Sequence, residues 1–155
     1  MGEWFLEYRR ATRNDIDLFA QNRIEFVTSI RSISDIEEFE RRTKEYLIDN
    51  IESDNAIIFI ATENNNIAAS CMACVYKTAP SPGCLTGQTA QLLNVYTKEE
   101  FRKKGHAKKL LKKLIDELKS LKIEKVLLEY TSDGRALYEK MGFTLLENQM
   151  QLKLK

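Results

Sequence analysis

The segment Asn94-Val-Tyr-Thr-Lys-Glu-Glu-Phe-Arg-Lys-Lys-Gly-His-Ala107 is the part of the chain that most strongly decides the fold. It lies between two elements that differ in their residue pattern. Residues 89–96 have the composition of a strand, whereas apolar side chains recur at helical spacing through residues 105–121. The chain is therefore expected to run from a strand end, through a turn, directly into a long helix.

The expected helix has one apolar face and one basic face. The apolar stripe consists of Ala107, Leu110, Leu111, Leu114, Ile115, Leu118 and Leu121. The opposite face carries Lys108, Lys109, Lys112 and Lys113, which is typical of a solvated helix surface above a sheet. A nucleic-acid surface would have more arginine and interleaved aromatic residues. Nucleic-acid binding is therefore not expected.

The turn before this helix has the features of an anion site. The amides of a helix start lack intrahelical partners and lie at the positive end of the helix dipole, which suits phosphate. Gly105 permits a tight turn or a close approach, and Arg102, Lys103 and Lys104 add positive charge. The pattern is neither Gly-x-Gly-x-x-Gly nor a Walker motif. It predicts a pyrophosphate cradle, with a purely structural turn as the alternative.

The remaining pattern predicts an α/β fold. Strands are expected at residues 4–10, 56–61, 67–76 and 125–130, and one or two closing strands within residues 143–154. One helix is expected to begin at residues 12–15, a second to begin at residues 34–35, and a short third helix to span residues 134–141. The alternation of strand and helix in the second half indicates a parallel βαβ unit. The turn Asn64-Asn-Asn66 indicates a hairpin, so the sheet is expected to be mixed. Without repeats or compositional breaks, residues 1–155 are expected to form a single domain.

Composition excludes several classes of protein. The 155 residues carry 24 Lys and Arg against 23 Asp and Glu, so a strongly basic or acidic partner surface is not expected. No apolar run approaches the ~20 residues of a membrane span. The start, Met1-Gly-Glu-Trp-Phe-Leu6, lacks the basic and apolar regions of a signal peptide. We therefore expect a cytoplasmic protein without membrane association.

The cysteine pattern does not predict a disulfide or a metal site. Cys71 and Cys74 have CxxC spacing but lie within the expected strand 67–76. Residues three apart on a strand point to opposite faces, so these thiols cannot pair there. The chain has 3 cysteines and 1 histidine, which leaves no set of zinc ligands.

Two segments, in order, resemble signatures of the GNAT superfamily of acetyl-CoA-dependent N-acetyltransferases. Arg102-Lys-Lys-Gly-His-Ala107 is similar to the Gln/Arg-x-x-Gly-x-Gly/Ala signature, and Ala136-Leu-Tyr-Glu-Lys-Met-Gly-Phe143 is similar to a downstream "LYEKxGF" segment. Tyr8-Arg-Arg-Ala-Thr-Arg-Asn-Asp15 resembles the usual opening of the family. The resemblance is strongest over residues 94–143. It implies a mixed sheet splayed at its central strand and flanked by helices, with acetyl-CoA as co-substrate and no metal.

The resemblance also implies roles for individual residues. The residues it assigns to cofactor binding are Asn94, Val95, Tyr96, Arg102, Lys103, Lys104, Gly105, His106, Ala107, Lys108, Ser132 and Tyr138. The strand end would pair with the pantetheine arm, and the amides of residues 103–107 would hold the pyrophosphate. Ser132 stands near the position where many relatives have a pantetheine-binding Asn. Tyr138 stands where the family has its general acid; a packed helix aromatic is the alternative.

The implied reaction is direct acetyl transfer to an amine in a ternary complex. A backbone N–H near Val95 would polarise the thioester carbonyl. The cysteines need no nucleophilic role, and His106 lies at a position where the backbone is expected to act. The base that deprotonates the amine is not identified; Glu25 and a water chain are the candidates.

Two other functions and the identity of the acceptor remain open at this stage. An acyl-CoA-binding module without activity would have the same fold, and a nucleic-acid binder is disfavoured by the near-neutral charge. In this family the acceptor site is formed by the segments that correspond to residues 20–35 and 77–88 of this chain. The charged residues there include Arg23, Glu25 and Arg31, and this mixture selects no class of amine. The expected partners are a small-molecule or protein amine and, because relatives are often dimers, a second copy of the chain.

Overall fold

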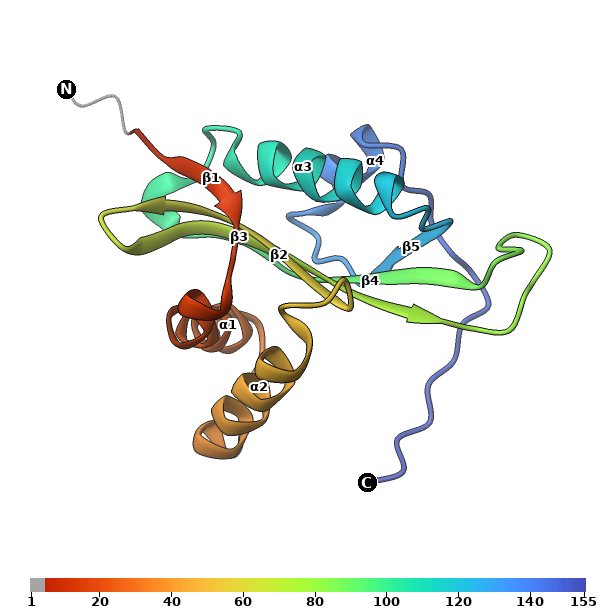
Figure 1. Cartoon of the computed structure of the whole chain (residues 1–155), viewed down its shortest axis with the longest axis horizontal. Helices are drawn as coiled ribbons and strands as arrows, with labels where there is room; N and C mark the ends of the chain where they lie inside the picture. Colours follow the sequence, from red (N-terminus) through yellow and green to blue (C-terminus); the bar gives the residue numbers. More distant parts are fainter. Residues whose placement is uncertain (1–4) are drawn as a thin grey trace.

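The computed structural model describes residues 5–155, in which five strands form one sheet (Figure 1). The strands are β1 (Glu7–Arg10), β2 (Ala56–Glu63), β3 (Asn66–Lys77), β4 (Gln88–Thr97) and β5 (Lys125–Leu128). They lie in the order of the sequence; each pair from β1 to β4 is antiparallel, and β4 and β5 are parallel. The expected α/β class and mixed sheet are confirmed.

Helices cover both faces of the sheet (Figure 1). On one face lie α1 (Ile16–Ile30) and α2 (Ile36–Asn50); on the other lie α3 (His106–Ser120) and the short α4 (Arg135–Lys140). Two single turns, η1 (Arg13–Asp15) and η2 (Glu99–Phe101), precede α1 and α3. The first strand is shorter than expected, and Trp4 lies outside the described residues.

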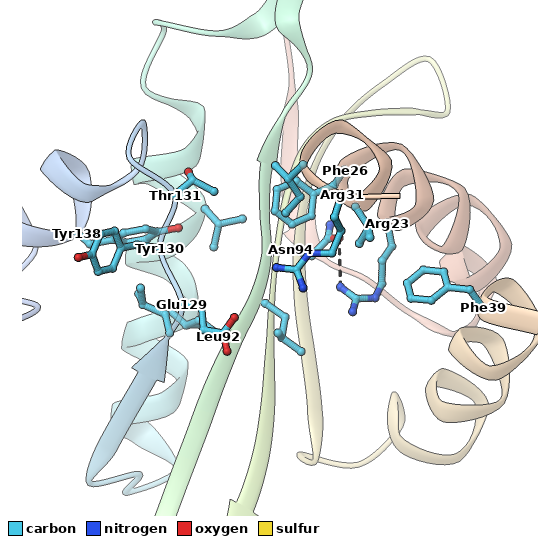
Figure 2. A pocket seen from close by; sticks show the side chains of 15 residues that line it. Arg23, Phe26, Arg31, Phe39, Leu92, Asn94, Glu129, Tyr130, Thr131 and Tyr138 are labelled. Atoms are coloured by element: carbon cyan, nitrogen blue, oxygen red, sulfur yellow. Dashed lines mark hydrogen bonds between the residues drawn. The ribbon is translucent and has the colours of Figure 1, made fainter. Parts of the chain in front are cut away.

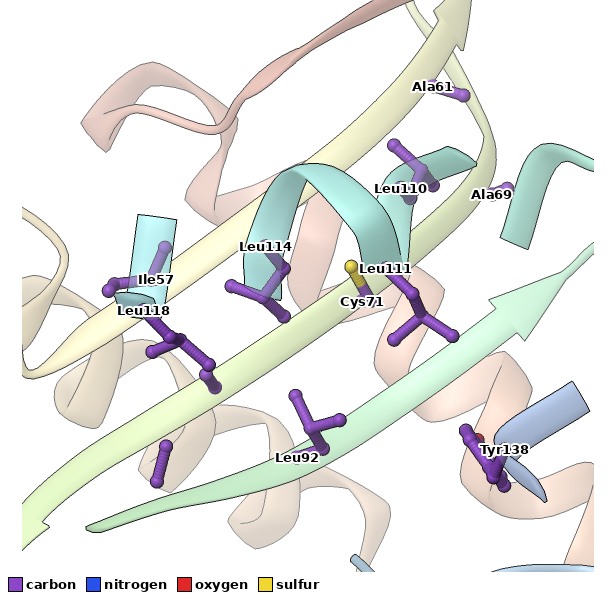
Figure 3. Close-up of a cluster of buried hydrophobic side chains, with 12 residues drawn as sticks. Ile57, Ala61, Ala69, Cys71, Leu92, Leu110, Leu111, Leu114, Leu118 and Tyr138 are labelled. Atoms are coloured by element: carbon purple, nitrogen blue, oxygen red, sulfur yellow. The ribbon is translucent and has the colours of Figure 1, made fainter. Parts of the chain in front are cut away.

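Strands β2 and β3 have predominantly apolar sequences, which suits strands that are covered on both faces of the sheet. Along β2, Ile57 packs against the leucines of α3, as Figure 3 shows, while its neighbour Ile58 packs with Phe19 of α1 and Leu47 of α2. All of these side chains are at most 1% exposed. Alternation along the strand therefore divides the core into two layers, one on each side of the sheet.

The two cysteines of β3 lie in different layers, as the strand geometry predicted. Cys71 belongs to the α3-side cluster, and Cys74 packs against the α1/α2-side cluster. All three cysteines are free thiols. Complete burial raises the pKa of the Cys71 thiol to about 12, which keeps it protonated and unreactive.

The parallel pair β4–β5 separates before β4 ends. Pairing runs from Thr89 with Lys125 to Leu92 with Leu128, and β5 stops there, while β4 continues to Thr97. The register between β3 and β4 shifts at the same level, where Asn94 has a φ of 54°. Such a bulge increases the local bend of a strand. The expected splay at the central strand is thus present, and the edge of residues 93–97 that faces away from β3 has no strand partner within residues 5–155.

The expected closing strands over residues 143–154 are wrong. This segment has no strand assignment, and Met150, Leu152 and Leu154 are at least 82% exposed. The alternation of these residues satisfies the pattern of a strand, but a strand also requires a neighbouring edge to pair with. In Figure 1 the C-terminal segment runs away from the sheet instead.

Candidate active site

The loop between β4 and α3 forms an exposed, amide-lined turn at a helix start. Lys103 has a φ of 63°, and Gly105, the residue before the helix, has a φ of 82°. No side chain of the described residues caps this helix, and the first intrahelical bond is donated by the amide of Lys109. The first-turn amides are therefore available to an external acceptor.

The space beside Gly105 is open in the part of the chain that the structure describes. A Cβ added to Gly105 would meet no atom within 4 Å. Arg102, Lys103, Lys104 and Lys108 are exposed around it, while Ala107 is partly buried. Arg102 Nε donates to the carbonyl of Thr97 at 3.0 Å, which ties the turn to the end of β4. The geometry fits an anion that approaches the backbone closely between positively charged side chains.

His106 is held by neighbouring side chains, and its surroundings favour the neutral imidazole. Its Nδ1 shares a hydrogen bond of 2.5 Å with the hydroxyl of Tyr8, and its ring lies near Phe101. Burial, then the charges of Lys104 and Lys109, lower the pKa of His106 below its usual value. Its Nε2 is buried without a partner among the described residues. These contacts with β1 and with the turn before α3 indicate a structural role for the imidazole.

The splayed strands enclose a pocket of about 340 Å³ between β4 and β5 (Figure 2). Asn94 and Val95 line it from β4, and Tyr138 lines it from α4. Tyr96 does not line it: the ring of Tyr96 turns toward α1 and contacts Phe26, with 5.3 Å between ring centroids. The pocket therefore lies where the residues of the strand end and the residue of α4 come together.

The amides near the end of β4 alternate in direction. The amide of Lys98 donates to the carbonyl of Ala68 on β3, and amides alternate in direction along a regular strand, so Tyr96 N–H points to β3. Val95 lies in the bulge, and we expect its N–H to point to the side from which β5 has separated, as a backbone donor at the open edge.

Tyr138 is a buried phenol at the wall of the pocket. Its side chain is 9% exposed and contacts Phe143, with 5.8 Å between ring centroids. Burial, with a smaller contribution from Cys71, raises the pKa of Tyr138 to about 12. The hydroxyl therefore stays protonated at neutral pH.

Ser132 does not reach the pocket. It is exposed in the turn before α4, whereas its neighbours Tyr130 and Thr131 line the pocket. Strand β5 ends at Leu128, so the chain has already left the extended conformation, and strand alternation no longer indicates which side chain faces inward.

A buried polar network holds the bulge of β4. Ser70 Oγ donates to Asn22 Oδ1 at 2.7 Å, and Asn94 Nδ2 donates to Asn22 Oδ1 and to Ser70 Oγ at 3.1 and 3.0 Å. All three residues are at most 4% exposed. No spacing along the sequence indicates this network, because its members come from α1, β3 and β4.

Removal of the central hydroxyl should be destabilising. Ser70→Ala is expected to lower the free energy of unfolding by about 1–3 kcal/mol, because it leaves buried amide groups with fewer partners. Urea denaturation measures this change. Ser120→Ala, at the exposed end of α3, is the matched control and should shift stability by less than about 0.5 kcal/mol. Equal stability of Ser70→Ala and the control would contradict a structural role for the network.

Only some charged residues of the expected acceptor region line the pocket. Arg23 and Arg31 line the pocket, but Glu25 lies elsewhere, 3.9 Å from Lys98, and does not line it. No residue of 77–88 lines it either. Glu129, which the sequence pattern did not single out, does line it; the signal was a polar residue directly after the half-buried strand β5.

The fold and the site together define a class of acyl-group transferase, in which a helix start and a splayed strand pair lie side by side. The profile of the Acetyltransferase (GNAT) family matches residues 24–143, and the chain belongs to this family. A comparison with curated proteins gave no match.

Solved structures agree with this assignment. A predicted acetyltransferase from Clostridium acetobutylicum, solved with acetyl-CoA, is 28% identical with a TM-score of 0.88, and the match covers 97% of each chain. A GCN5-related N-acetyltransferase from Ralstonia eutropha is 19% identical with a TM-score of 0.85, covering 97% of this chain and 99% of the other. Glucosamine-6-phosphate N-acetyltransferase from Arabidopsis thaliana is 24% identical with a TM-score of 0.68, covering 97% and 99%. The last two show a shared fold.

Residues 5–155 lack two other features. No group of three or more His, Cys, Asp or Glu side chains there is arranged to hold a metal ion. No helix in this part of the chain has both the length and the apolar character needed to cross a membrane.

Proposed function

We propose that the protein transfers the acetyl group of acetyl-CoA to a primary amine by direct attack within a ternary complex. The observation that supports this most strongly is the uncapped, glycine-preceded start of α3 beside the open edge of β4. Family membership and the relative solved with acetyl-CoA support the same donor.

In this proposal the backbone holds most of the donor. The first-turn amides of α3 bind the diphosphate, with Arg102, Lys103, Lys104 and Lys108 supplying positive charge. The pantetheine arm lies along residues 94–96 and takes the hydrogen bonds that β5 leaves unmade. This is a form of strand addition.

The reaction then requires a polarised carbonyl and a protonated leaving group. The neutral amine attacks the thioester carbon, and Val95 N–H donates to the oxygen as negative charge develops there. When the C–S bond breaks, the electron pair leaves with sulfur, and the phenol of Tyr138 supplies a proton to it. An acceptor that arrives as an ammonium ion first gives one proton to water. The N–H proton released on attack passes through water and restores the phenol of Tyr138, so the products are an amide and CoA.

The single histidine provides a direct test of the cradle. CoA should raise the pKa of His106, because the diphosphate would place negative charge beside this residue and favour its protonated form. The pKa is measured by following the ring resonance in NMR titrations with and without saturating CoA. Pantetheine, which lacks the diphosphate, is the matched control and should leave the pKa unchanged. A His106 pKa that does not respond to CoA would put the diphosphate elsewhere.

Catalysis is tested separately from binding. Release of free thiol from acetyl-CoA in the presence of a panel of primary amines demonstrates transfer. CoA binding without thiol release from any amine would indicate instead a non-catalytic acyl-CoA-binding module.

A further inference from the structure

Arg23 is a half-buried cation without a counter-charge among residues 5–155. Its guanidinium lies between α1 and β4, 5.5 Å from the ring centroid of Phe39, and its one hydrogen bond to a described residue is to Asn94 Oδ1 at 3.5 Å (Figure 2). Within residues 5–155 no carboxylate lies at ion-pair distance from it. Burial lowers the pKa of this guanidinium. A desolvated, unpaired charge is unfavourable unless a partner arrives.

Arg31 brings a second unpaired guanidinium to the same wall. It follows the last residue of α1, is exposed, and has no ion pair with any described residue. Figure 2 shows Arg31 and Arg23 both reaching from α1 toward Asn94. Two planar guanidinium groups on one wall suit an oxyanion, which they bind through paired hydrogen bonds.

The nearby acidic groups do not neutralise these arginines. Glu38 of α2 is bound by Arg41 and Arg42, and Asp35 caps α2 by accepting from the amide of Glu38. Glu129 lines the pocket from the β5 side, across from the arginines in Figure 2. The pocket is therefore bipolar, with positive charge on the α1 wall and negative charge on the β5 wall.

We infer that the acceptor amine also carries an oxyanion, a carboxylate or a phosphate, which Arg23 and Arg31 bind while Glu129 faces its amine end. This inference rests on the proposed acetyl transfer and names the substrate class. A pocket of about 340 Å³ holds a small molecule, so amino acids and amino phosphates are the chemical types that fit.

Matched acceptor pairs test the inference. The pairs are phenylalanine with phenethylamine, ornithine with putrescine, and O-phosphoethanolamine with ethanolamine, so each pair differs in one anionic group. In at least one pair, kcat/KM should be about tenfold or more higher for the anionic member, and the pair concerned distinguishes carboxylate from phosphate.

Arg23→Gln should remove that preference. We expect kcat/KM for the anionic member to fall about 10- to 100-fold, mainly through KM, and kcat/KM for its partner to change less than about threefold. Arg31→Gln, at an exposed and unpaired position, should reduce the same preference without any risk to folding. Arg23→Lys keeps the positive charge but loses the planar guanidinium with its paired donors, so it should retain part of the preference. Arg41→Gln, which removes a charge on α2 outside the pocket, should leave the preference intact.

The outcomes separate this inference from the proposed function. Acetylation of both members of every pair at similar kcat/KM, or equal losses for both members in Arg23→Gln, would overturn the inference and leave acetyl transfer standing. If none of the six compounds is acetylated, calorimetric titration of each into the CoA-saturated protein decides: tighter binding of an anionic member supports the inference, and its absence overturns it. Failure to bind CoA would count against the proposed function itself.

Discussion

A Gly105→Val variant is expected to lose CoA binding, with the dissociation constant rising on the order of 100-fold or more. The wild-type position has a φ of 82° and no atom within 4 Å of an added Cβ, so the new side chain would fill the space through which a diphosphate reaches the first-turn amides. Loss of two or three charge-assisted hydrogen bonds accounts for an effect of this size. Isothermal titration with CoA measures it.

Backbone strain has to be separated from this steric effect. Valine is poorly tolerated at positive φ wherever it occurs. Gly142→Val is the matched control, because Gly142 has a φ of 99°, likewise has no atom near an added Cβ, and lies after α4, away from the cradle. This control should bind CoA normally. Gly105→Ala, with a smaller side chain, should weaken binding less than valine. Unchanged CoA affinity in Gly105→Val would refute the cradle.

A Tyr138→Phe variant is expected to lower kcat by roughly 100-fold while CoA affinity stays the same. The ring still fills its place against Phe143, so only the hydroxyl is lost. With a pKa of about 12, the phenol is a weaker acid than a thiol of pKa near 8.5, so the proton should move as the C–S bond breaks rather than before it. Stopped-time thiol release with a reactive amine measures kcat.

The pH profile gives a second test of Tyr138. Because burial disfavours the phenolate, the acid form persists above the usual pKa of about 10, and Tyr138 should cause no fall in kcat between about pH 7 and pH 10. Tyr76→Phe, at an exposed site on β3, is the control and should retain normal turnover. Wild-type turnover by Tyr138→Phe would remove this residue from the mechanism.

The sequence was most informative where the structure depends on neighbours along the chain. The leucine spacing from Leu110 to Leu118 predicted α3, and Gly105 predicted the turn before it, because periodicity and backbone freedom are local properties. The same reasoning failed for the closing strands. Alternation in residues 149–154 describes which side chains would share a face, but not whether an edge of the sheet accepts the segment.

The candidate site divides in the same way. The proposed cradle is one continuous segment, so its residues could be named from the sequence, and their roles stay predictions. Ser132 lies outside the pocket lining because β5 ends at Leu128 and the chain bends before reaching it, and its predicted contact with pantetheine stays a prediction. Arg23, Arg31 and Glu129 could be assigned to one pocket only from the structure, because α1 and β5 lie on opposite sides of the splayed strand β4.

The order of residues thus determined the class of fold, the start of α3 and the presence of Tyr138 on α4, since these follow from residue patterns within single segments. Only tertiary structure decided which charged side chains share a pocket, which serine and asparagines support the bulge, and which strands have an edge left open. These features join segments that lie more than 20 residues apart along the chain. For example, the hydroxyl of Ser70 donates to the backbone carbonyl of Asn94, which is 24 positions away. Burial and missing counter-charges arise from how such segments pack, and no spacing along the chain encodes them.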